Sequence, residues 1–252
     1  MQPEIGPILD IAVKAGAAVM WVYNDNPEPD VTFKEDESPL TLADKISHEI
    51  IVLGLTELYP GVPILSEEGA AIDFEIRKEW EYYWCVDPLD GTKEFINRNG
   101  EFTVNIALIH KNVPVLGVIF VPCMNTLYFG SGKGSFKQRL GENPVPIKSD
   151  SDSREWVSVG SRSHSVANES DFLQQYPIVR HESAGSSIKF CLIAEGKAHI
   201  YYRKGPTMEW DTAAGHAIAG FSGAIVETDQ FQPFLYNKEN LRNGGFVCRV
   251  NN

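Results

Sequence analysis

Several features that define other classes of protein are scarce or missing in this chain of 252 residues. The four cysteines, Cys85, Cys123, Cys191 and Cys248, are far apart and form no CxxC pair. A chain of this size needs no disulfide staples, so we expect reduced, buried thiols. The N-terminal stretch MQPEIGPILD has an early acidic residue and no basic n-region, so we do not expect a secretory signal.

Long hydrophobic runs are also missing. No apolar run approaches the roughly 18–20 residues that cross a bilayer. We therefore expect no integral membrane segment. The expected location is the cytoplasm, with peripheral attachment at the inner membrane as the open alternative.

Positive charge is scarce. Lys and Arg number 22 against 34 Asp and Glu, which gives a net charge of −12. This balance argues against binding a nucleic acid polymer, whose backbone attracts clustered basic residues. A small phosphorylated substrate remains compatible with it, because an acidic protein that handles phosphate can use metal cations to reverse the local field.

The length and the 43% hydrophobic content suit one large domain or two closely packed halves. Apolar residues recur at helical spacing in PEIGPILDIAVKAGAAVMWVYN, which predicts a first helix. A second helix is predicted to begin near Thr41. Its expected inner side consists of five apolar residues: Leu42, Ile46, Ile50, Leu53 and Leu58.

The periodicity then changes to that of strands. VPILSEE, YYWCVD, FTVNIALIH, VPVLGVIFVP, NTLYFG and GSFKQR predict a largely antiparallel sheet, with a hairpin at Lys111-Asn112. The polar segment 141–154 is the predicted boundary. Beyond it, EWVSVGS, IVRHE, AHIYYR and GAIVET predict strands, and SSIKFCLIAEG and DTAAGHAIAGF predict helices. We thus predict an α+β half over residues 1–150 and an α/β half over 151–252.

Carboxylates fall where predicted strands end and helices begin. They are Glu67, Glu68, Asp87, Asp90 and Asp211. Ligands of α/β layers gather at such places, so these acids could converge although they are far apart in sequence.

Each acid also has a plain structural interpretation. Asp87-Pro-Leu-Asp could be a surface turn, and Glu67-Glu68 a solvated loop. Asp211 could be only a helix N-cap, and Asp44 only the third-position acid of a capping box opened by Thr41. Taken singly, these interpretations are at least as good as a functional one; taken together they are weaker.

The stretch VDPLDGTKEF combines residues that suit metal-assisted phosphate chemistry. Asp87 and Asp90 can point at one spot across a proline turn, and the carbonyl of Leu89 can join them as a ligand for Mg²⁺. Gly91 lets the backbone approach a ligand closely. Thr92 opens a predicted helix, whose free N–H groups suit a phosphate.

A second anion-binding element is predicted in the other half. Gly185, Ser186 and Ser187 precede a helix with Lys189 in its first turn. Hydroxyls, helix N–H groups and an ammonium suit the second phosphate of a bisphosphate nucleotide. The alternative is that the serines only cap the helix and that Lys189 is solvated.

LSEE, VDPLDGTKEF and EWDTAAGHA, in this order and spacing, resemble the three signatures of the inositol monophosphatase superfamily, the lithium-sensitive, magnesium-dependent phosphatases. The resemblance covers nearly the whole chain and implies a layered α-β-α-β-α sandwich of sugar-phosphatase type. DGTKEFINRNGEFTVNIALI, SRSH, GSSIKFCLIAEG and GPTMEWDTAAG are most similar to the bacterial CysQ-type branch, the 3'(2'),5'-bisphosphate nucleotidases.

The resemblance implies a metal site and a water-activating pair. The implied ligands of two or three Mg²⁺ ions are Glu67, Asp87, the Leu89 carbonyl, Asp90 and Asp211. Asp44 would orient Thr92, which would help to deprotonate the attacking water. Glu68 matches an acidic position that either lies behind the ligands, without touching the ions, or helps to orient water.

The implied activity is hydrolysis of the 3'-phosphate of adenosine 3',5'-bisphosphate (PAP), with the sulfated analogue PAPS as a further substrate, in sulfur assimilation. An inositol or sugar phosphate phosphatase, or a non-catalytic sensor, is the alternative. Besides the metal-site residues, His164 and Arg203 match positions that line the substrate pocket, although a lone His or Arg is more often a surface or packing residue. The chain is expected to be a monomer or a homodimer.

Overall fold

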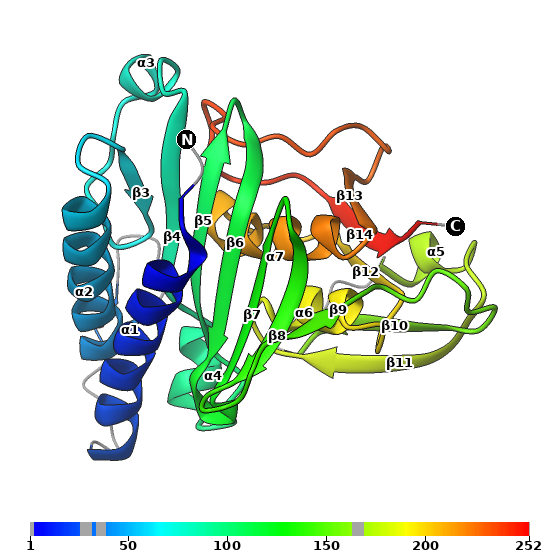
Figure 1. Cartoon of the computed structure of the whole chain (residues 1–252). Helices are drawn as coiled ribbons and strands as arrows, with labels where there is room; N and C mark the ends of the chain where they lie inside the picture. Colours follow the sequence, from blue (N-terminus) through cyan, green and yellow to red (C-terminus); the bar gives the residue numbers. More distant parts are fainter. Residues whose placement is uncertain (1–2, 26–31, 34–38, 163–168, 252) are drawn as a thin grey trace.

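The computed structural model describes residues 3–25, 32–33, 39–162 and 169–251. It has five layers, which alternate between helices and sheets as predicted (Figure 1). The helices α1 (Ile5–Asp25) and α2 (Leu42–Leu58) form the first layer. A large sheet, a pair of central helices, a small sheet and one short helix follow in that order.

The large sheet has seven strands in the order β3-β4-β5-β6-β7-β8-β9. The β3–β4 pair is parallel, and each later pair is antiparallel. The strands are β3 (Ile64–Ser66), β4 (Tyr82–Asp90), β5 (Thr103–His110), β6 (Val113–Val121), β7 (Thr126–Ser131), β8 (Gly134–Arg139) and β9 (Val145–Ile147).

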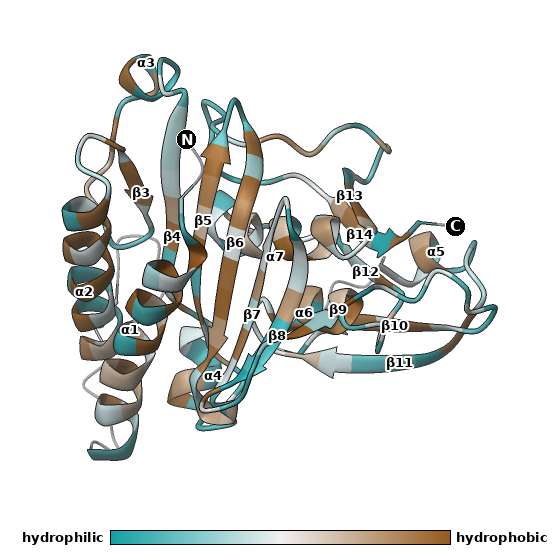
Figure 2. Ribbon diagram, in the orientation of Figure 1, coloured by the Kyte–Doolittle hydropathy of each residue, from teal (hydrophilic) through white to brown (hydrophobic). Residues whose placement is uncertain are grey.

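Both faces of this sheet are covered, and most residues of its central strands are therefore apolar. In β4, Tyr83 and Cys85 belong to the core on the side of the central helices, whereas Trp84 and Val86 belong to the core under α1 and α2. Successive side chains of a strand point to opposite faces, so each core takes alternate residues. Figure 2 shows the hydrophobic colouring along β5 and β6.

The buried face of α2 differs from the one expected. It consists of Ala43, Asp44, Ser47, Ile51 and Leu55. The expected inner residues Leu42, Leu53 and Leu58 are 50%, 71% and 44% exposed. The helix is rotated so that its two buried polar residues face the end of β4, where both find hydrogen-bond partners.

Helix α1 is more apolar than the absence of long apolar runs suggests. Within the described residues it is the one helix long and apolar enough to cross a membrane, with a mean hydropathy of 1.6 over its best window. In the fold, however, Ile8, Ile11, Ala12 and Val19 are buried in the core against the large sheet. The helix thus serves as a core element of the sandwich.

The small sheet has the strand order β11-β10-β12-β14-β13. Strand β10 pairs in parallel with β11 and β12, and β14 is antiparallel to both of its neighbours. The strands are β10 (Trp156–Ser161), β11 (Ile178–Ala184), β12 (Ile200–Arg203), β13 (Ala224–Thr228) and β14 (Phe246–Val250). The polar stretch near Ser170 forms α5 (Glu169–Leu173), and Phe172 packs on the outer face of this sheet.

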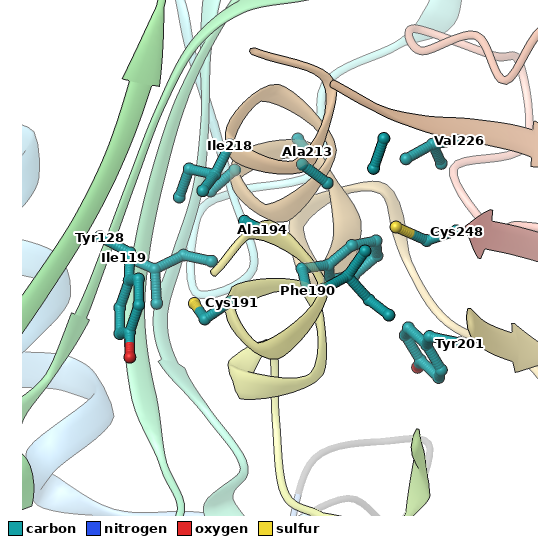
Figure 3. Packing of buried hydrophobic residues seen from close by; sticks show 14 of the residues in the cluster. Ile119, Tyr128, Phe190, Cys191, Ala194, Tyr201, Ala213, Ile218, Val226 and Cys248 are labelled. Carbon is teal, nitrogen blue, oxygen red and sulfur yellow. The ribbon is translucent and has the colours of Figure 1, made fainter. Parts of the chain in front are cut away.

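The central layer joins the two sheets. It consists of α6 (Ile188–Ala194) and α7 (Glu209–Phe221). Figure 3 shows Ile119 and Tyr128 of the large sheet on one side of these helices, and Val226 and Cys248 of the small sheet on the other. One continuous core therefore connects both sheets, although the sheets themselves lie on either side of the predicted boundary. The proposed division at residue 150 stays a prediction.

Several short elements were not predicted, including the strands β9 and β14. Further unpredicted elements are β1 (Thr32–Phe33), β2 (Pro39–Leu40), α3 (Phe74–Arg77) and the 3-10 helix η1 (Pro122–Met124). The helix α4 (Thr92–Ile96), by contrast, is the predicted helix start after VDPLDG. The four cysteines are free, as expected, but Cys123 is exposed whereas the other three are buried.

The contact between β6 and α7 leaves no room for a side chain at Gly117. A Cβ there would lie 2.3 Å from the carbonyl oxygen of Ala214 and 2.9 Å from the Cβ of Ala217. We expect Gly117→Ala to lower the free energy of unfolding by about 1–3 kcal/mol, because helix and sheet must move apart. Urea denaturation measures the change.

Gly220→Ala is the matched control. Gly220 lies in the same helix, and a Cβ there would meet nothing within 4 Å. It should leave stability unchanged or raise it by up to about 1 kcal/mol, because alanine favours the helix. Equal losses in the two variants would contradict the close approach of β6 and α7.

Candidate active site

A cavity of about 810 Å³ opens where segments of both sheets meet the central helices. It is lined by the end of β4, the start of α4, the segment before α6, the end of β12 and the start of α7. Glu67, Asp87, Asp90 and Asp211, which lie up to 144 positions apart (67 to 211), are among its lining residues. Four of the five acids predicted at strand ends and helix starts therefore do converge, and Glu68 is the exception.

The Asp87–Asp90 stretch is not a surface turn. Asp87 and Leu89 are each 1% exposed, and β4 continues to Asp90 with a break in its register between Asp87 and Asp90. The main-chain N–H of Leu89 donates to Asp87 Oδ1 at 3.0 Å, and Ser47 Oγ of α2 donates to the Pro88 carbonyl at 2.7 Å. These bonds fix the irregular backbone, so the carboxylates have a defined direction.

Three of the acids form a compact cluster. One carboxylate oxygen each of Glu67, Asp87 and Asp211 lies within 4.8 Å of the others. Burial raises the pKa of Asp87 and of Asp211 well above the usual range of an aspartate, and the neighbouring carboxylates raise it further. The cluster therefore destabilises the metal-free fold at neutral pH, and a divalent cation with oxygen preference would relieve the repulsion.

Asp90 lies beside this cluster in a more polar setting. Its Oδ2 is 2.8 Å from Ser187 Oγ and accepts a hydrogen bond from Asn105 Nδ2 at 3.3 Å. Burial raises the pKa of Asp90, whereas the positive charge of Lys189 and the hydrogen bond from Ser187 lower it. Ser187 thus orients a carboxylate and does not cap α6 through its side chain.

Asp44 takes part in two interactions at once. The N–H and hydroxyl of Thr41 donate to its Oδ2 at 2.8 and 2.6 Å, which is the capping box of α2. Its Oδ1 lies 3.4 Å from Thr92 Oγ1, which is also 3.4 Å from the Leu89 carbonyl oxygen. The cap therefore holds the carboxylate in place and leaves its second oxygen toward the threonine at the cavity.

Asp211, like Asp44, takes part in a capping box, and it also lines the cavity. It is the third residue of α7, and its Oδ2 accepts a hydrogen bond from the N–H of Met208 at 2.8 Å. The N-cap residue is Met208, so the suggestion that Asp211 is the N-cap is wrong.

Gly91 has φ of 92°, a conformation that favours glycine, and a Cβ there would lie 3.3 Å from Ser186.

The segment before α6 lies beside Asp90 and Gly91. Gly185 N donates to Glu101 Oε2 at 2.8 Å. Ser186 has φ of 42° and lines the cavity, and no hydrogen-bond partner for its buried Oγ occurs in the described part of the chain. A strained residue that presents a hydroxyl in this way is typical of a ligand site.

Lys189 is not solvated, contrary to the structural alternative. It is 4% exposed, lines the cavity and donates from Nζ to the carbonyl oxygens of Ala184 and Ser186. Burial lowers its pKa to about 8, although Asp90 opposes this. An ammonium has three donors, so it can direct a further one toward a ligand.

The remaining predicted residues vary in their placement. Arg203 ends β12, is 6% exposed and lines the cavity, where its positive charge lowers the pKa of Asp211. Glu68 is half-buried and follows Glu67, but it is not among the lining residues. His164 lies outside the described residues.

Sequence reasoning overlooked two supporting residues. Asn105, which bonds Asp90, is a polar residue within an otherwise apolar strand, and this is the signal that could have found it. Ser47 lies three positions after Asp44 and so on the same side of α2. The expected inner face of α2 consists of apolar residues alone, and it therefore excludes Ser47.

Comparison with known proteins agrees with this geometry. The model of the inositol monophosphatase family matches residues 4–245. The 3'(2'),5'-bisphosphate nucleotidase CysQ of Escherichia coli K12 is 47% identical over 245 residues, which cover 96% of this chain and 98% of that protein.

Solved structures agree as well. The crystal structure of CysQ from Bacteroides thetaiotaomicron, a bacterial member of the inositol monophosphatase family, superposes with a TM-score of 0.84 at 42% identity and covers 97% of this chain and 96% of that one. The suppressor protein SuhB of Bartonella henselae shares the fold at 20% identity, with a TM-score of 0.79, and the match covers 98% and 93% of the two chains.

The repulsion within the acid cluster leads to a stability prediction. Asp87→Asn should raise the free energy of unfolding of the metal-free protein at pH 7.5 by roughly 1–3 kcal/mol, because it removes a buried charge that its neighbours repel. The amide oxygen can still accept from the N–H of Leu89. The same variant should lose stabilisation by Mg²⁺, measured as the thermal midpoint with and without the ion.

Asp73→Asn is the control for this change. Asp73 caps the short helix α3 through Oδ1, and asparagine caps equally well. The substitution removes the same charge at the surface and should alter neither stability nor the response to Mg²⁺. A metal-free Asp87→Asn protein less stable than wild type would contradict the assigned repulsion.

Proposed function

The chain belongs to the inositol monophosphatase family, and on that premise we propose that it is a 3'(2'),5'-bisphosphate nucleotidase. Its reaction is hydrolysis of the 3'-phosphate of PAP to AMP and phosphate. The proposal rests above all on the E. coli relative, which is named for this activity and matches along nearly its whole length. PAPS is a further proposed substrate, and the proposed role is in sulfur assimilation in the cytoplasm.

The family is metal-dependent, generally with Mg²⁺. The residues present fit such an ion, because buried Asp87 and partly buried Glu67 and Asp211 offer carboxylate oxygens that repel one another. We assign these three residues, Asp90 and the Leu89 carbonyl as ligands of two or three ions. When bound, the ions supply charge for the phosphate oxygens and a more acidic water.

The chain's own contribution to proton transfer lies at Thr92. Its hydroxyl can donate to Asp44 Oδ1 or to the Leu89 carbonyl oxygen, both 3.4 Å away. Because the capping box fixes Asp44, the Thr92 hydroxyl can keep an acceptor lone pair toward an attacking water. Glu68, which follows Glu67, would help to order water from outside the cavity lining.

We assign selection of a bisphosphate to three donors of the cavity that lie close to Asp90 and Asp211. Ser186 Oγ, Lys189 Nζ and the Arg203 guanidinium suit a phosphate. Ser187 instead supports Asp90, and Gly185 fixes the backbone through Glu101. In this proposal the phosphate that leaves binds at the acids, and the phosphate that stays binds near Lys189. His164 remains a proposed pocket residue.

A substrate panel tests the proposal. Purified protein with Mg²⁺ should release phosphate from PAP with a much higher kcat/KM than from inositol 1-phosphate, and EDTA or Li⁺ should suppress the release. A protein that cleaves inositol or sugar phosphates well and PAP poorly would instead be a monophosphatase of the same family. No release from any of these substrates would favour a non-catalytic sensor.

The pKa of Lys189 leads to a prediction for the pH profile. The ammonium loses its proton near pH 8, so kcat/KM for PAP should fall as the pH rises above about 8. Lys189→Met should lower kcat/KM for PAP and remove this alkaline decline, with most of the loss in KM. Initial rates between pH 6.5 and 9.5 measure both. An unchanged alkaline limb in the variant would exclude Lys189 as its origin.

A further inference from the structure

The chain returns to the active site after β13, in a loop over residues 236–243 that no prediction included. This loop lies against the residues that begin α7. The N–H of Glu209 donates to the Leu241 carbonyl at 3.0 Å, the N–H of Asn243 donates to the Thr207 carbonyl at 2.7 Å, and Met208 pairs with Arg242 as an isolated bridge.

The side chain of Asn243 makes the central contacts of this junction. It is 5% exposed, and its Nδ2 lies 3.0 Å from Thr207 Oγ1, 2.8 Å from the Met208 carbonyl and 3.2 Å from Thr212 Oγ1. Thr207, Met208 and Thr212 all line the cavity. One amide group therefore binds cavity residues from both sides of Asp211.

The orientation of this amide is fixed by a charged neighbour. Lys238 Nζ lies 3.0 Å from Asn243 Oδ1 and 2.6 Å from Glu209 Oε1. An ammonium can only donate, so the amide oxygen must face Lys238 and the NH₂ group must face α7. Glu209 is fully buried and also accepts from the N–H of Asn237 at 2.7 Å, which ties the loop to the first turn of the helix.

Asp211 depends on the same turn. Its Oδ2 accepts from the N–H of Met208, whose carbonyl accepts from Asn243. Movement of Met208 would therefore turn the Asp211 carboxylate relative to Glu67 and Asp87. In metal sites, residues that orient a ligand without touching the ion affect metal affinity strongly.

We propose that Asn243 is a positioning residue that sets the Asp211 carboxylate for metal binding through Thr207, Met208 and Thr212. This inference rests on the proposed role of Asp211 as a ligand. It assigns to the C-terminal loop a share in building the active site. The loop contributes through hydrogen bonds to the start of α7 and needs no contact of Asn243 with substrate.

The test measures the affinity for Mg²⁺ without relying on turnover. For metal-free protein, the thermal midpoint rises with Mg²⁺ concentration, and the concentration at which the rise sets in, fitted as Kd in RT ln(1 + [Mg²⁺]/Kd), reports affinity. Asn243→Ala should raise this concentration roughly tenfold. Thr207→Val, which removes one acceptor and keeps the side-chain shape, should raise it by a smaller factor and decides the question if Asn243→Ala does not fold.

Asn112→Gly is the matched control. Asn112 Nδ2 donates to the Tyr236 carbonyl at 2.7 Å, so it tethers the other end of the same loop, and its φ of 68° suits glycine. This variant should lose thermal stability but keep the Mg²⁺ concentration of wild type. In activity assays, Asn243→Ala should need more Mg²⁺ for half-maximal rate and keep the wild-type KM for PAP at saturating Mg²⁺.

The outcomes separate this inference from the proposed function. If the wild type responds to Mg²⁺ and Asn243→Ala, or Thr207→Val in its place, responds at the same concentrations, Asn243 is only structural and the inference is wrong. If Asn112→Gly shifts the Mg²⁺ concentration equally, a general loosening of the loop explains the effect and the inference is also wrong. If the wild type itself shows no response to Mg²⁺, the metal assignment fails and takes the inference with it.

Discussion

Carboxylates that repel one another are crowded together at the cavity, and the surrounding structure holds them there. Asp87 and Asp211 are both driven by burial toward the protonated state, and Glu67 adds to that tendency. Each is restrained by a main-chain N–H, from Leu89 and Met208 respectively. The fold thus keeps these carboxylates in place at a local loss of stability, which a bound cation would offset.

The five-layer architecture makes this crowding possible. Asp87 lies near the end of a strand of the large sheet, and Asp211 lies in the first turn of a helix that packs against both sheets. The close contact of Gly117 with the backbone of α7 fixes the helix relative to the sheet, and with it the distance between the two carboxylates. The cavity is therefore a product of the same packing that stabilises the core.

Much of this could be predicted from the sequence, because the signals are local. The alternation along YYWCVD, the turn at Lys111-Asn112 and the acids before helices each depend on neighbouring residues. The orientation of α2 could not, since it is decided by the hydrogen-bond partners that Asp44 and Ser47 find in β4 and α4. The link from Asn243 to Asp211 is likewise a contact between distant segments, and no spacing in the sequence reveals it. The roles of the site residues themselves stay predictions.

Leu89 contributes its side chain to the hydrophobic core and its carbonyl oxygen to the cavity. Its side chain is buried in the core beneath α1 and α2, and its carbonyl oxygen lies 3.4 Å from Thr92 Oγ1 in the cavity. No substitution can delete that oxygen, because every residue has one. What can change is its position, through the fit of the leucine among the helices behind it. Substitutions in the outer helix layer would thus shift the Leu89 carbonyl oxygen, although the substituted residues themselves do not line the cavity.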